Sequence, residues 1–295
     1  MSATAELWQS QRAKRRDGVV ALVAAATIWG CFPVYWRFLS FTNSIDILSN
    51  RIMWSFAVGM VLHRIVSGAF VPRSVPMRQV LLLLASALVL STNWCISIYA
   101  VEVNRVVEGG IGMFFAPIFQ LIIGRVLFKE SFNSTKVIVV FISVITGVML
   151  IYDLNAVPYI AIGMGLSFAT YATIKKMVSV PALQGFIIET GLLFLPAVAY
   201  VTLNGSRLTS GGFQNISELL LLAGAGAIAA PPLILYGFGA QRVSLSTSGM
   251  MLNLIPIINI AVGVLVLQEA ISPLRGLSAI LVSVAVLFYS YRRGE

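Results

Sequence analysis

Two stretches of the chain decide its fold: residues 112–152, GMFFAPIFQLIIGRVLFKESFNSTKVIVVFISVITGVMLIY, and residues 251–291, MLNLIPIINIAVGVLVLQEAISPLRGLSAILVSVAVLFYSY. An offset of 139 residues aligns them and pairs five landmarks: Pro117 with Pro256, Gly124 with Gly263, Glu130 with Glu269, Lys136 with Arg275, and Tyr152 with Tyr291. Between the landmarks both stretches are apolar. The chain therefore contains an internal repeat of apolar segments.

The composition indicates that lipid surrounds these segments. The chain has 295 residues, of which 58% are apolar and only 11% are charged, whereas a soluble domain carries about 25% charged residues. A water-soluble protein of this length cannot hide that much apolar surface, so we expect a membrane protein.

Ten apolar segments are long enough to cross a bilayer, which takes about 20 residues of helix. Their runs are continuous, whereas the strands of a membrane barrel alternate between apolar and polar residues. We therefore predict an all-α integral membrane protein with ten transmembrane helices: 18–39, 45–66, 79–100, 107–128, 135–152, 157–176, 183–203, 216–239, 245–268 and 272–291.

The basic residues predict how these helices are oriented. When both termini are placed in the cytoplasm, most of the 20 Lys and Arg fall on the cytoplasmic side, among them Lys175 and Lys176 at the end of the sixth segment. Only Arg105, Arg207 and Arg275 fall outside. Cytoplasmic loops are enriched in positive charge, so the bias supports cytoplasmic N and C termini.

The repeat and the orientation together predict three regions. Residues 1–17 form a basic cytoplasmic tail, 18–152 a first five-helix repeat, and 157–291 a second one. Because five is an odd number, the second repeat enters the membrane from the opposite side and is inverted. Secondary transporters commonly have this architecture, with the substrate site at the repeat interface near the middle of the membrane.

Arg51 is the first candidate for a binding residue. It lies about six residues inside the second segment, and an arginine within a membrane usually faces the bundle interior or an aqueous cavity. The functional interpretation is an anchor for an anionic group of a substrate. The structural alternatives are snorkelling to the interface and an ion pair with Asp46, about one turn away.

Glu189 in the seventh segment is the second candidate. Its neighbours in sequence are apolar, from Ile187 and Ile188 to Leu192 and Phe194. Apolar surroundings favour the uncharged form of a carboxyl group, which suits proton coupling or binding of a substrate amine. A structural hydrogen bond to a neighbouring helix is the alternative. Arg51 and Glu189 enter from opposite faces, so direct pairing does not follow, and the sequence leaves open whether they flank one cavity.

Several aromatic and amide side chains also qualify as substrate contacts. Asn93 and Trp94 combine hydrogen-bonding capacity with an aromatic surface, and Trp54 lies one turn beyond Arg51. Trp29 and Tyr171 complete the set. Aromatic residues near helix ends commonly belong to the interfacial belt, but Trp29 and Trp94 lie nearer the middle of their segments.

Prolines and glutamates mark points where helices bend or begin. Pro117 and Pro256 occupy matching positions in the two repeats, where proline removes a backbone hydrogen bond and bends a helix, so we interpret them as hinges. A static kink that improves packing is the alternative. We also expect Pro231-Pro232 to break the eighth segment. Glu130 and Glu269 are expected to cap the N-termini of the fifth and tenth segments.

No catalytic or metal-binding constellation appears in the sequence. The nucleophile motif GxSxG, the zinc motif HExxH and the phosphate-binding loop GxxxxGK[ST] are all absent. With a single histidine, the sequence predicts neither a metal site nor a cofactor and does not favour an enzyme. The basic residues separate apolar segments and form no nucleic-acid patch. The expected partners are a small-molecule substrate and the lipid bilayer, with the protein a monomer or homodimer.

The chain resembles a known family in motifs spread over nearly its whole length: Ile28-Trp29-Gly30, Arg51-Ile52-Met53-Trp54-Ser55, Asn93-Trp94, Lys175-Lys176 and Ile188-Glu189-Thr190. These motifs are similar to those of the drug/metabolite transporter superfamily, EamA type, and most of all to the RarD proteins. The resemblance implies two inverted five-helix repeats in a bacterial cytoplasmic (inner) membrane, with a central cavity and export of small metabolites or drugs. Where RarD proteins have a Gln-Tyr pair before the second proline, this chain has Leu252-Asn253, which leaves the substrate open.

We therefore expect a secondary active transporter that exports amino acids, amines or amphipathic drugs by alternating access. Glu189 binds a proton or a substrate amine, and a cavity with one cation and one anion suits a zwitterion. An uncoupled facilitator is an alternative. A membrane-embedded lipid enzyme is a second, although the spans offer no cluster of Asp or His. A non-transporting scaffold is a third, although the loops are short.

Overall fold

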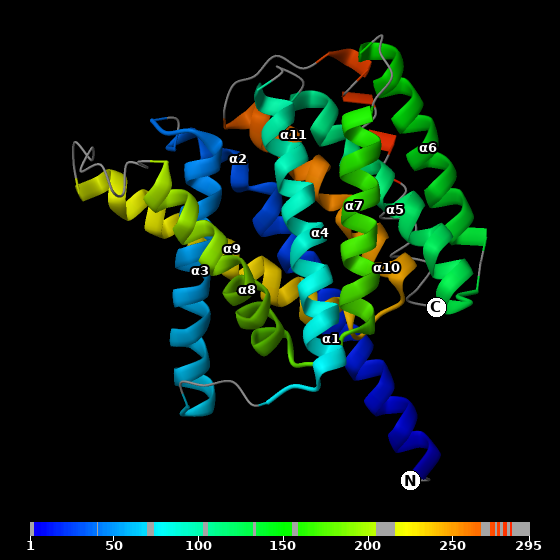
Figure 1. The fold of residues 1–295 in the computed structure, drawn as a ribbon. Helices are drawn as coiled ribbons and strands as arrows, with labels where there is room; N and C mark the ends of the chain where they lie inside the picture. Colours follow the sequence, from blue (N-terminus) through cyan, green and yellow to red (C-terminus); the bar gives the residue numbers. More distant parts are fainter. Residues whose placement is uncertain are drawn as a thin grey trace.

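The computed structural model describes residues 3–266, except 40, 70–73, 103–105, 132–133, 155–158 and 205–215, and scattered positions between 272 and 284. Up to residue 266 the described chain is helical and contains no strand (Figure 1). Its helices are α1 Ala3–Gly30, α2 Phe32–Arg37, α3 Ser44–Ser67, α4 Met77–Glu102, α5 Val106–Phe128, α6 Ser134–Leu154, α7 Tyr159–Met177, α8 Ala182–Leu203, α9 Ile216–Ala240, α10 Leu245–Leu252 and α11 Leu254–Leu265.

Five stretches among the described residues are long and apolar enough to cross a membrane: Gln11–Arg37, Ile45–Ser67, Met77–Ser97, Ala182–Leu203 and Ile216–Ala240. Shorter apolar helices run over Phe115–Phe128, Val140–Asp153 and Leu245–Ile258. Large apolar side chains on these helices face outward, and Leu195 is 74% exposed. An outer surface of this kind suits lipid and not water, so the predicted all-α membrane class is confirmed.

The predicted segments recur with shifted ends. Segment 18–39 is two helices, because the chain turns at Cys31 and Pro33 stands in the first turn of α2, where proline is tolerated. Segment 245–268 is also two helices, α10 and α11. The first helix begins at Ala3, inside the predicted tail 1–17. Most of the tenth predicted segment, 272–291, lies outside the described residues.

Local signals fix several of these ends. The Asn43 side chain accepts a hydrogen bond from the backbone N–H of Asp46, 2.8 Å, which caps the start of α3. Gly68 ends the same helix at φ 73°, a left-handed conformation that glycine adopts without strain. The Ser244 hydroxyl accepts from the N–H of Thr247 and so caps α10.

The expected break at Pro231-Pro232 is wrong, because α9 continues through both prolines to Ala240. Close contacts on either side of the two prolines explain why the helix stays continuous. Gly226 lies directly against the backbone of α3, and Gly239 lies against Leu22 of α1. Close packing by neighbouring helices supports a proline-containing segment in a membrane protein, so the prolines do not end it.

Helices from the first part of the chain pack mainly on helices from the second part. The main contacts between the two parts join α3 with α8 and α9, α4 with α7 and α8, α1 with α9 and α11, and α5 with α7 and α10. The buried core runs through their centre, from Leu22 on α1 to Phe168 on α7, Tyr236 on α9 and Met250 on α10. The chain therefore forms one body in which its two parts interleave (Figure 1).

Candidate functional site

A pocket opens where α3, α4, α8 and α9 meet. Its walls are mainly apolar, and the two ionisable groups among its lining residues are Arg51 and Glu189. The prediction left open whether these two residues share a cavity, and the structure answers that they do. The lining consists of Arg51, Ile52, Ser55, Ala87, Leu90, Trp94, Phe186, Glu189, Thr190, Leu193 and Leu233.

Arg51 is held by aromatic rings. Its guanidinium carbon lies 4.1 Å from the ring centroid of Trp94 and 5.9 Å from that of Trp36. Its Nε atom is buried without a hydrogen-bond partner, and no residue that the structure describes forms an ion pair with this arginine. Cation–π contacts of this kind stabilise a cation but do not neutralise its charge.

Asp46, the expected structural partner of Arg51, is engaged elsewhere. Its carboxylate accepts hydrogen bonds from the Thr42 hydroxyl, 3.1 Å, and from the Asn43 side-chain amide, 3.3 Å. Residues five apart on a helix point in directions about 140° apart, because each residue turns the helix by about 100°. Asp46 therefore serves the start of α3 and leaves Arg51 uncompensated.

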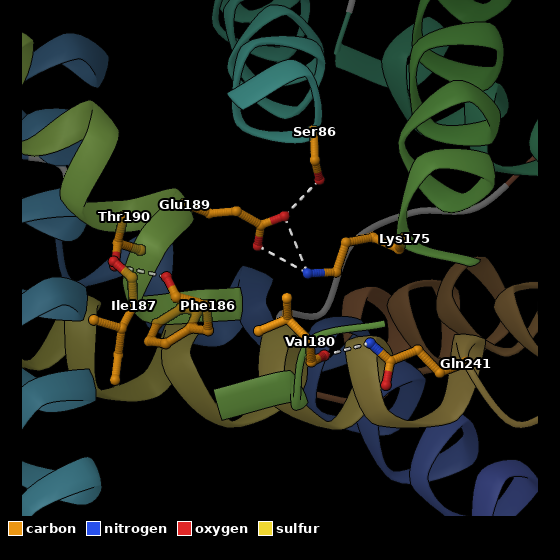
Figure 2. Close-up of polar contacts among 8 residues, drawn as sticks. All are labelled: Ser86, Lys175, Val180, Phe186, Ile187, Glu189, Thr190 and Gln241. Atoms are coloured by element: carbon orange, nitrogen blue, oxygen red, sulfur yellow. Dashed lines mark hydrogen bonds and ion pairs between the residues drawn. The ribbon is translucent and has the colours of Figure 1, made fainter. Parts of the chain in front are cut away.

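Glu189 lies at the centre of a buried polar cluster that joins three helices (Figure 2). Its Oε1 accepts a hydrogen bond from the Ser86 hydroxyl of α4 at 2.5 Å, and the Lys175 ammonium of α7 lies 3.0 Å from both carboxylate oxygens. The side chains of Lys175 and Glu189 are only 2% and 7% exposed. The carboxylate and the ammonium thus neutralise each other inside the protein.

Lys175, which the prediction counted as a topology signal, also belongs to this polar cluster. It lies in the last turn of α7, and the short turn to α8 brings it beneath Glu189, two turns into the next helix. The sequence held a signal that was missed: Lys175 falls inside the predicted segment 157–176. A lysine within a membrane helix normally pairs with an acid.

The turn between α7 and α8 is fixed by hydrogen bonds from other helices. Gln241 donates to the carbonyl of Val180 at 2.8 Å (Figure 2), and Gln79 accepts from the N–H of Ser179 at 3.0 Å. Lys176 donates to the carbonyl of Val243. Because this turn is held on several sides, Lys175 is pre-organised toward Glu189.

Asn93 and Trp94 have different roles although they are adjacent. The Asn93 amide donates to the carbonyl of Met164 at 3.0 Å and to the hydroxyl of Ser167 at 2.9 Å, so it ties α4 to α7. Trp94 faces the other way, into the pocket and onto Arg51. The structure thus puts Trp94 with Arg51 and Glu189, and Asn93 behind them.

Trp29 and Tyr171 belong to an aromatic cluster and not to the pocket lining. Trp29 contacts Phe168 and Tyr236 at centroid distances of 6.0 and 5.6 Å, and Tyr171 stacks on Tyr236 at 5.8 Å. The Tyr171 hydroxyl is buried and has no hydrogen-bond partner. The cluster forms the packed centre of the molecule between α1, α7 and α9.

Trp54 is likewise absent from the pocket lining. It packs where α3 crosses α9, and a Cβ added at Gly226 would overlap it and lie 2.6 Å from the backbone nitrogen of Ser55. The Ser55 hydroxyl donates to the Gly226 carbonyl at 3.2 Å at the same crossing. Trp54 thus marks a tight helix contact beside the pocket.

The two predicted hinge prolines occupy unequal positions. Pro117 lies inside α5, which continues unbroken, whereas Pro256 lies in the first turn of α11, after a one-residue break at Asn253. A proline ring clashes with the carbonyl four residues earlier, and for Pro256 that residue is Leu252, the last of α10. Gly249 of α10 packs on Pro117, where an added Cβ would lie 3.0 Å from its Cα.

Glu130 caps a helix that is distant from it in the sequence. Its Oε1 accepts from the N–H of Leu245 at 2.6 Å, and its Oε2 accepts from the N–H of Ser246 at 3.1 Å, at the start of α10. The prediction placed its cap at the helix that follows Glu130 in sequence, and this stays a prediction because residues 132–133, just before that helix, lie outside the described residues. The packing of α5 on α10 brings a second helix start to Glu130. Glu269 lies outside the described residues.

The described residues contain no group of three or more His, Cys, Asp or Glu side chains that would hold a metal ion.

Comparison with known proteins places this geometry in context. Protein RarD of Streptomyces exfoliatus is 31% identical over 286 residues, which cover 95% of this chain and 90% of that protein. Protein RarD of Escherichia coli is 31% identical over 79% of this chain and 80% of its own length. The uncharacterized transporter YojE of Bacillus subtilis is 28% identical over 95% of this chain and 96% of its own length.

A solved crystal structure shares the fold. It matches with a TM-score of 0.74, covering 95% of this chain and 99% of that chain, at 15% sequence identity. At that identity the likeness concerns the fold alone. No protein-family model matches the chain.

Proposed function

Because this chain belongs to the RarD family of transporters, we propose that it is a secondary active transporter that exports small metabolites by alternating access. It is a multi-pass protein of the bacterial inner membrane. The proposed substrates are amino acids, amines or amphipathic drugs, and the proposed coupling ion is the proton.

One observation carries this proposal: the pocket contains two oppositely charged residues from different parts of the chain. Arg51 and Trp94 come from α3 and α4, and Glu189 and Thr190 come from α8. Ionisable groups within a membrane are costly and commonly mark a substrate or ion path. A pocket shared by two halves is also where alternating access needs a site.

An inverted repeat explains the arrangement around the pocket. The 139-residue offset pairs Arg51 with Thr190 and Trp94 with Leu233, and all four line the pocket. The same offset pairs Trp29 with Phe168, whose rings touch. Residues that meet their own equivalents lie on a symmetry axis, so these pairs support a pseudo-two-fold axis through the pocket.

The helix contacts support the same symmetry. If α3 corresponds to α8 and α4 to α9, the contact of α3 with α9 has its counterpart in that of α8 with α4. The contact of α4 with α7 likewise corresponds to that of α9 with α1. We therefore retain ten helices, cytoplasmic termini and two repeats, 18–152 and 157–291, as part of the proposal.

In this mechanism, Arg51, Trp94 and Glu189 contact the substrate directly. The other predicted residues do not contact the substrate but stabilise the packing of the helices that line the pocket: Asn93, Trp54, Trp29 and Tyr171. Bending near Pro117 and Pro256 opens the two sides in turn, where α5 crosses α10. A proton bound by Glu189 removes its charge and releases Lys175, so proton binding is linked to the position of α7.

Transport into liposomes tests the proposal. Purified protein is reconstituted and screened for uptake of labelled amino acids, amines and drug-like compounds, with and without an imposed pH gradient. The wild type should show gradient-driven uptake that Glu189→Gln abolishes. The matched control is Arg242→Gln, which removes an exposed cation outside the pocket and should transport normally.

A second variant separates a coupling defect from a folding defect. Glu189→Gln leaves Lys175 buried without its partner, whereas Lys175→Met combined with Glu189→Gln removes both charges. Loss of gradient dependence in a folded double variant supports coupling at this pair. Uptake by the wild type that ignores the gradient would favour a facilitator instead, and an absence of uptake for all compounds would contradict the transporter proposal.

A further inference from the structure

The charges at the pocket do not balance. Glu189 contributes one negative charge, and Lys175 neutralises it with its ammonium 3.0 Å from both carboxylate oxygens. Arg51 contributes a positive charge for which no described residue supplies a carboxylate. The described site therefore carries one uncompensated positive charge, whereas Arg51 and Glu189 considered alone would suggest neutrality.

The contacts of Arg51 leave its charge without an anionic partner among the described residues. The pocket has a volume of only about 10 Å³, room for about one water molecule, so an organic ligand enters only when the pocket opens. Trp94 covers one side of the Arg51 guanidinium, with its ring centroid 4.1 Å from the guanidinium carbon, and the buried Nε has no hydrogen-bond partner among the described residues. The guanidinium has five N–H donors in a planar fork that matches a carboxylate. A buried donor without a partner is costly, so the site gains when a ligand oxygen accepts from it.

We propose that the pocket, once it opens during alternating access, binds an organic monoanion, whose carboxylate or similar group pairs with Arg51 while its apolar body lies against Trp94, Leu90 and Leu193. This inference rests on the proposed transport function but replaces the amino acids and amines named there with organic acids, because neither a zwitterion nor an amine finds a free anion at Glu189. The apolar lining selects a hydrophobic body, and the net charge selects an acid.

A matched set of probes tests the sign of the charge. Phenylacetate, phenylacetamide, 2-phenylethylamine and phenylglycine present similar aromatic bodies with negative, neutral, positive and zwitterionic groups. Binding of labelled phenylacetate to purified protein in detergent is measured, and the other three are used as competitors. Phenylacetate should bind roughly ten- to hundredfold more tightly than phenylacetamide, as expected for a charge-assisted pair.

Three variants separate the roles of the two cations. Arg51→Gln should weaken phenylacetate binding roughly ten- to hundredfold, whereas Arg51→Lys should retain the preference for phenylacetate over phenylacetamide. Lys175→Met exposes the charge of Glu189 and should shift the preference from phenylacetate toward 2-phenylethylamine. Arg242→Gln is the control and should bind like the wild type. Gel filtration and thermal unfolding establish that each variant is folded.

The outcomes distinguish this inference from the proposed function. If phenylglycine or 2-phenylethylamine binds most tightly, if phenylacetamide equals phenylacetate, or if none of the four binds, the monoanion inference is overturned. The transporter proposal survives these results, because it is tested by uptake of other compounds. If phenylacetate binds through Arg51 but no compound crosses the liposome membrane, the binding inference stands and the transport proposal fails.

Discussion

The two halves of the chain bring different charges to the same pocket. In the first half, Arg51 lies between Trp36 and Trp94 and has no ion-pair partner among the described residues. In the second half, Glu189 is enclosed by Lys175 and Ser86. The 139-residue offset pairs Asn50 with Glu189 and Trp36 with Lys175, so one half has neutral residues where the other has an ion pair.

The charge of Arg51 is thus available to a ligand, whereas the charge of Glu189 is used in an ion pair within the protein. A buried ion pair with good geometry keeps its charges inside the structure, and it is sensitive to the loss of either partner. An arginine on aromatic faces keeps its charge and its donors for something else. Four predictions test this contrast between the two charges, from the largest expected effect to the smallest.

The largest effect is expected at the ion pair. Lys175→Met or Glu189→Gln alone leaves a buried group without its partner and should lower the free energy of unfolding by about 3–5 kcal/mol. The double variant removes both charges and should recover most of that loss. Thermal or denaturant unfolding in detergent measures it, and a double variant as unstable as the sum of the singles would show that the pair is not coupled.

Ser86→Ala should have an intermediate effect. It removes the hydroxyl that donates to Glu189 at 2.5 Å but leaves Lys175 in place. Hydrogen bonds to charged groups contribute about 1.5–3 kcal/mol, so we expect a loss in that range. The same unfolding assay measures it, with Ser91→Ala as the control, because the Ser91 hydroxyl bonds only within its own helix, to the Ala87 carbonyl. Equal losses in the two variants would argue against a role for Ser86 in the cluster.

Replacing the two hinge prolines should change the transport rate by different amounts. Pro117→Ala restores a backbone donor inside α5, which is continuous, and should slow transport several-fold without changing substrate affinity. Pro256→Ala should do less, because the break at Asn253 remains. Uptake rates and binding constants measured side by side test this. A larger effect of Pro256→Ala on the transport rate would make Pro256, and not Pro117, the more important hinge.

The smallest effect on stability is expected at Arg51. Arg51→Met removes a charge that no described residue compensates and retains an apolar side chain between two tryptophans. Cation–π contacts contribute about 0.5–2 kcal/mol, and relief of desolvation offsets part of this, so the net change should be about 1 kcal/mol or less. A loss as large as that of Glu189→Gln would mean that Arg51 has a structural partner.

Much of the fold could be predicted because a bilayer restricts what a chain can do. Continuous apolar runs near 20 residues long have few alternatives to membrane helices, and the segment 183–203 differs from α8, Ala182–Leu203, by a single residue. Breaks were harder to predict. Pro231-Pro232 does not interrupt α9, whereas Asn253 separates α10 from α11, because neighbouring helices decide whether a weak point in a helix opens.

The candidate site was predicted in part. Arg51, Trp94 and Glu189 meet in the pocket, and each carried a visible signal, a charge or a tryptophan inside an apolar segment. The other predicted contacts lie behind the pocket: Asn93, Trp54, Trp29 and Tyr171. The sequence could not separate them from the lining residues, because it does not say which face of a helix turns inward. Lys175 was missed as a site residue because it was counted as a topology signal.

The sequence by itself determined that this protein is a helical membrane protein, because hydropathy is a property of one segment at a time. Only the tertiary structure decided which charges meet. Glu189 pairs with Lys175 through the turn between α7 and α8, and Glu130 caps α10 across 115 positions of the chain. Partners of this kind depend on distances in space, and these distances are fixed only when the helices pack.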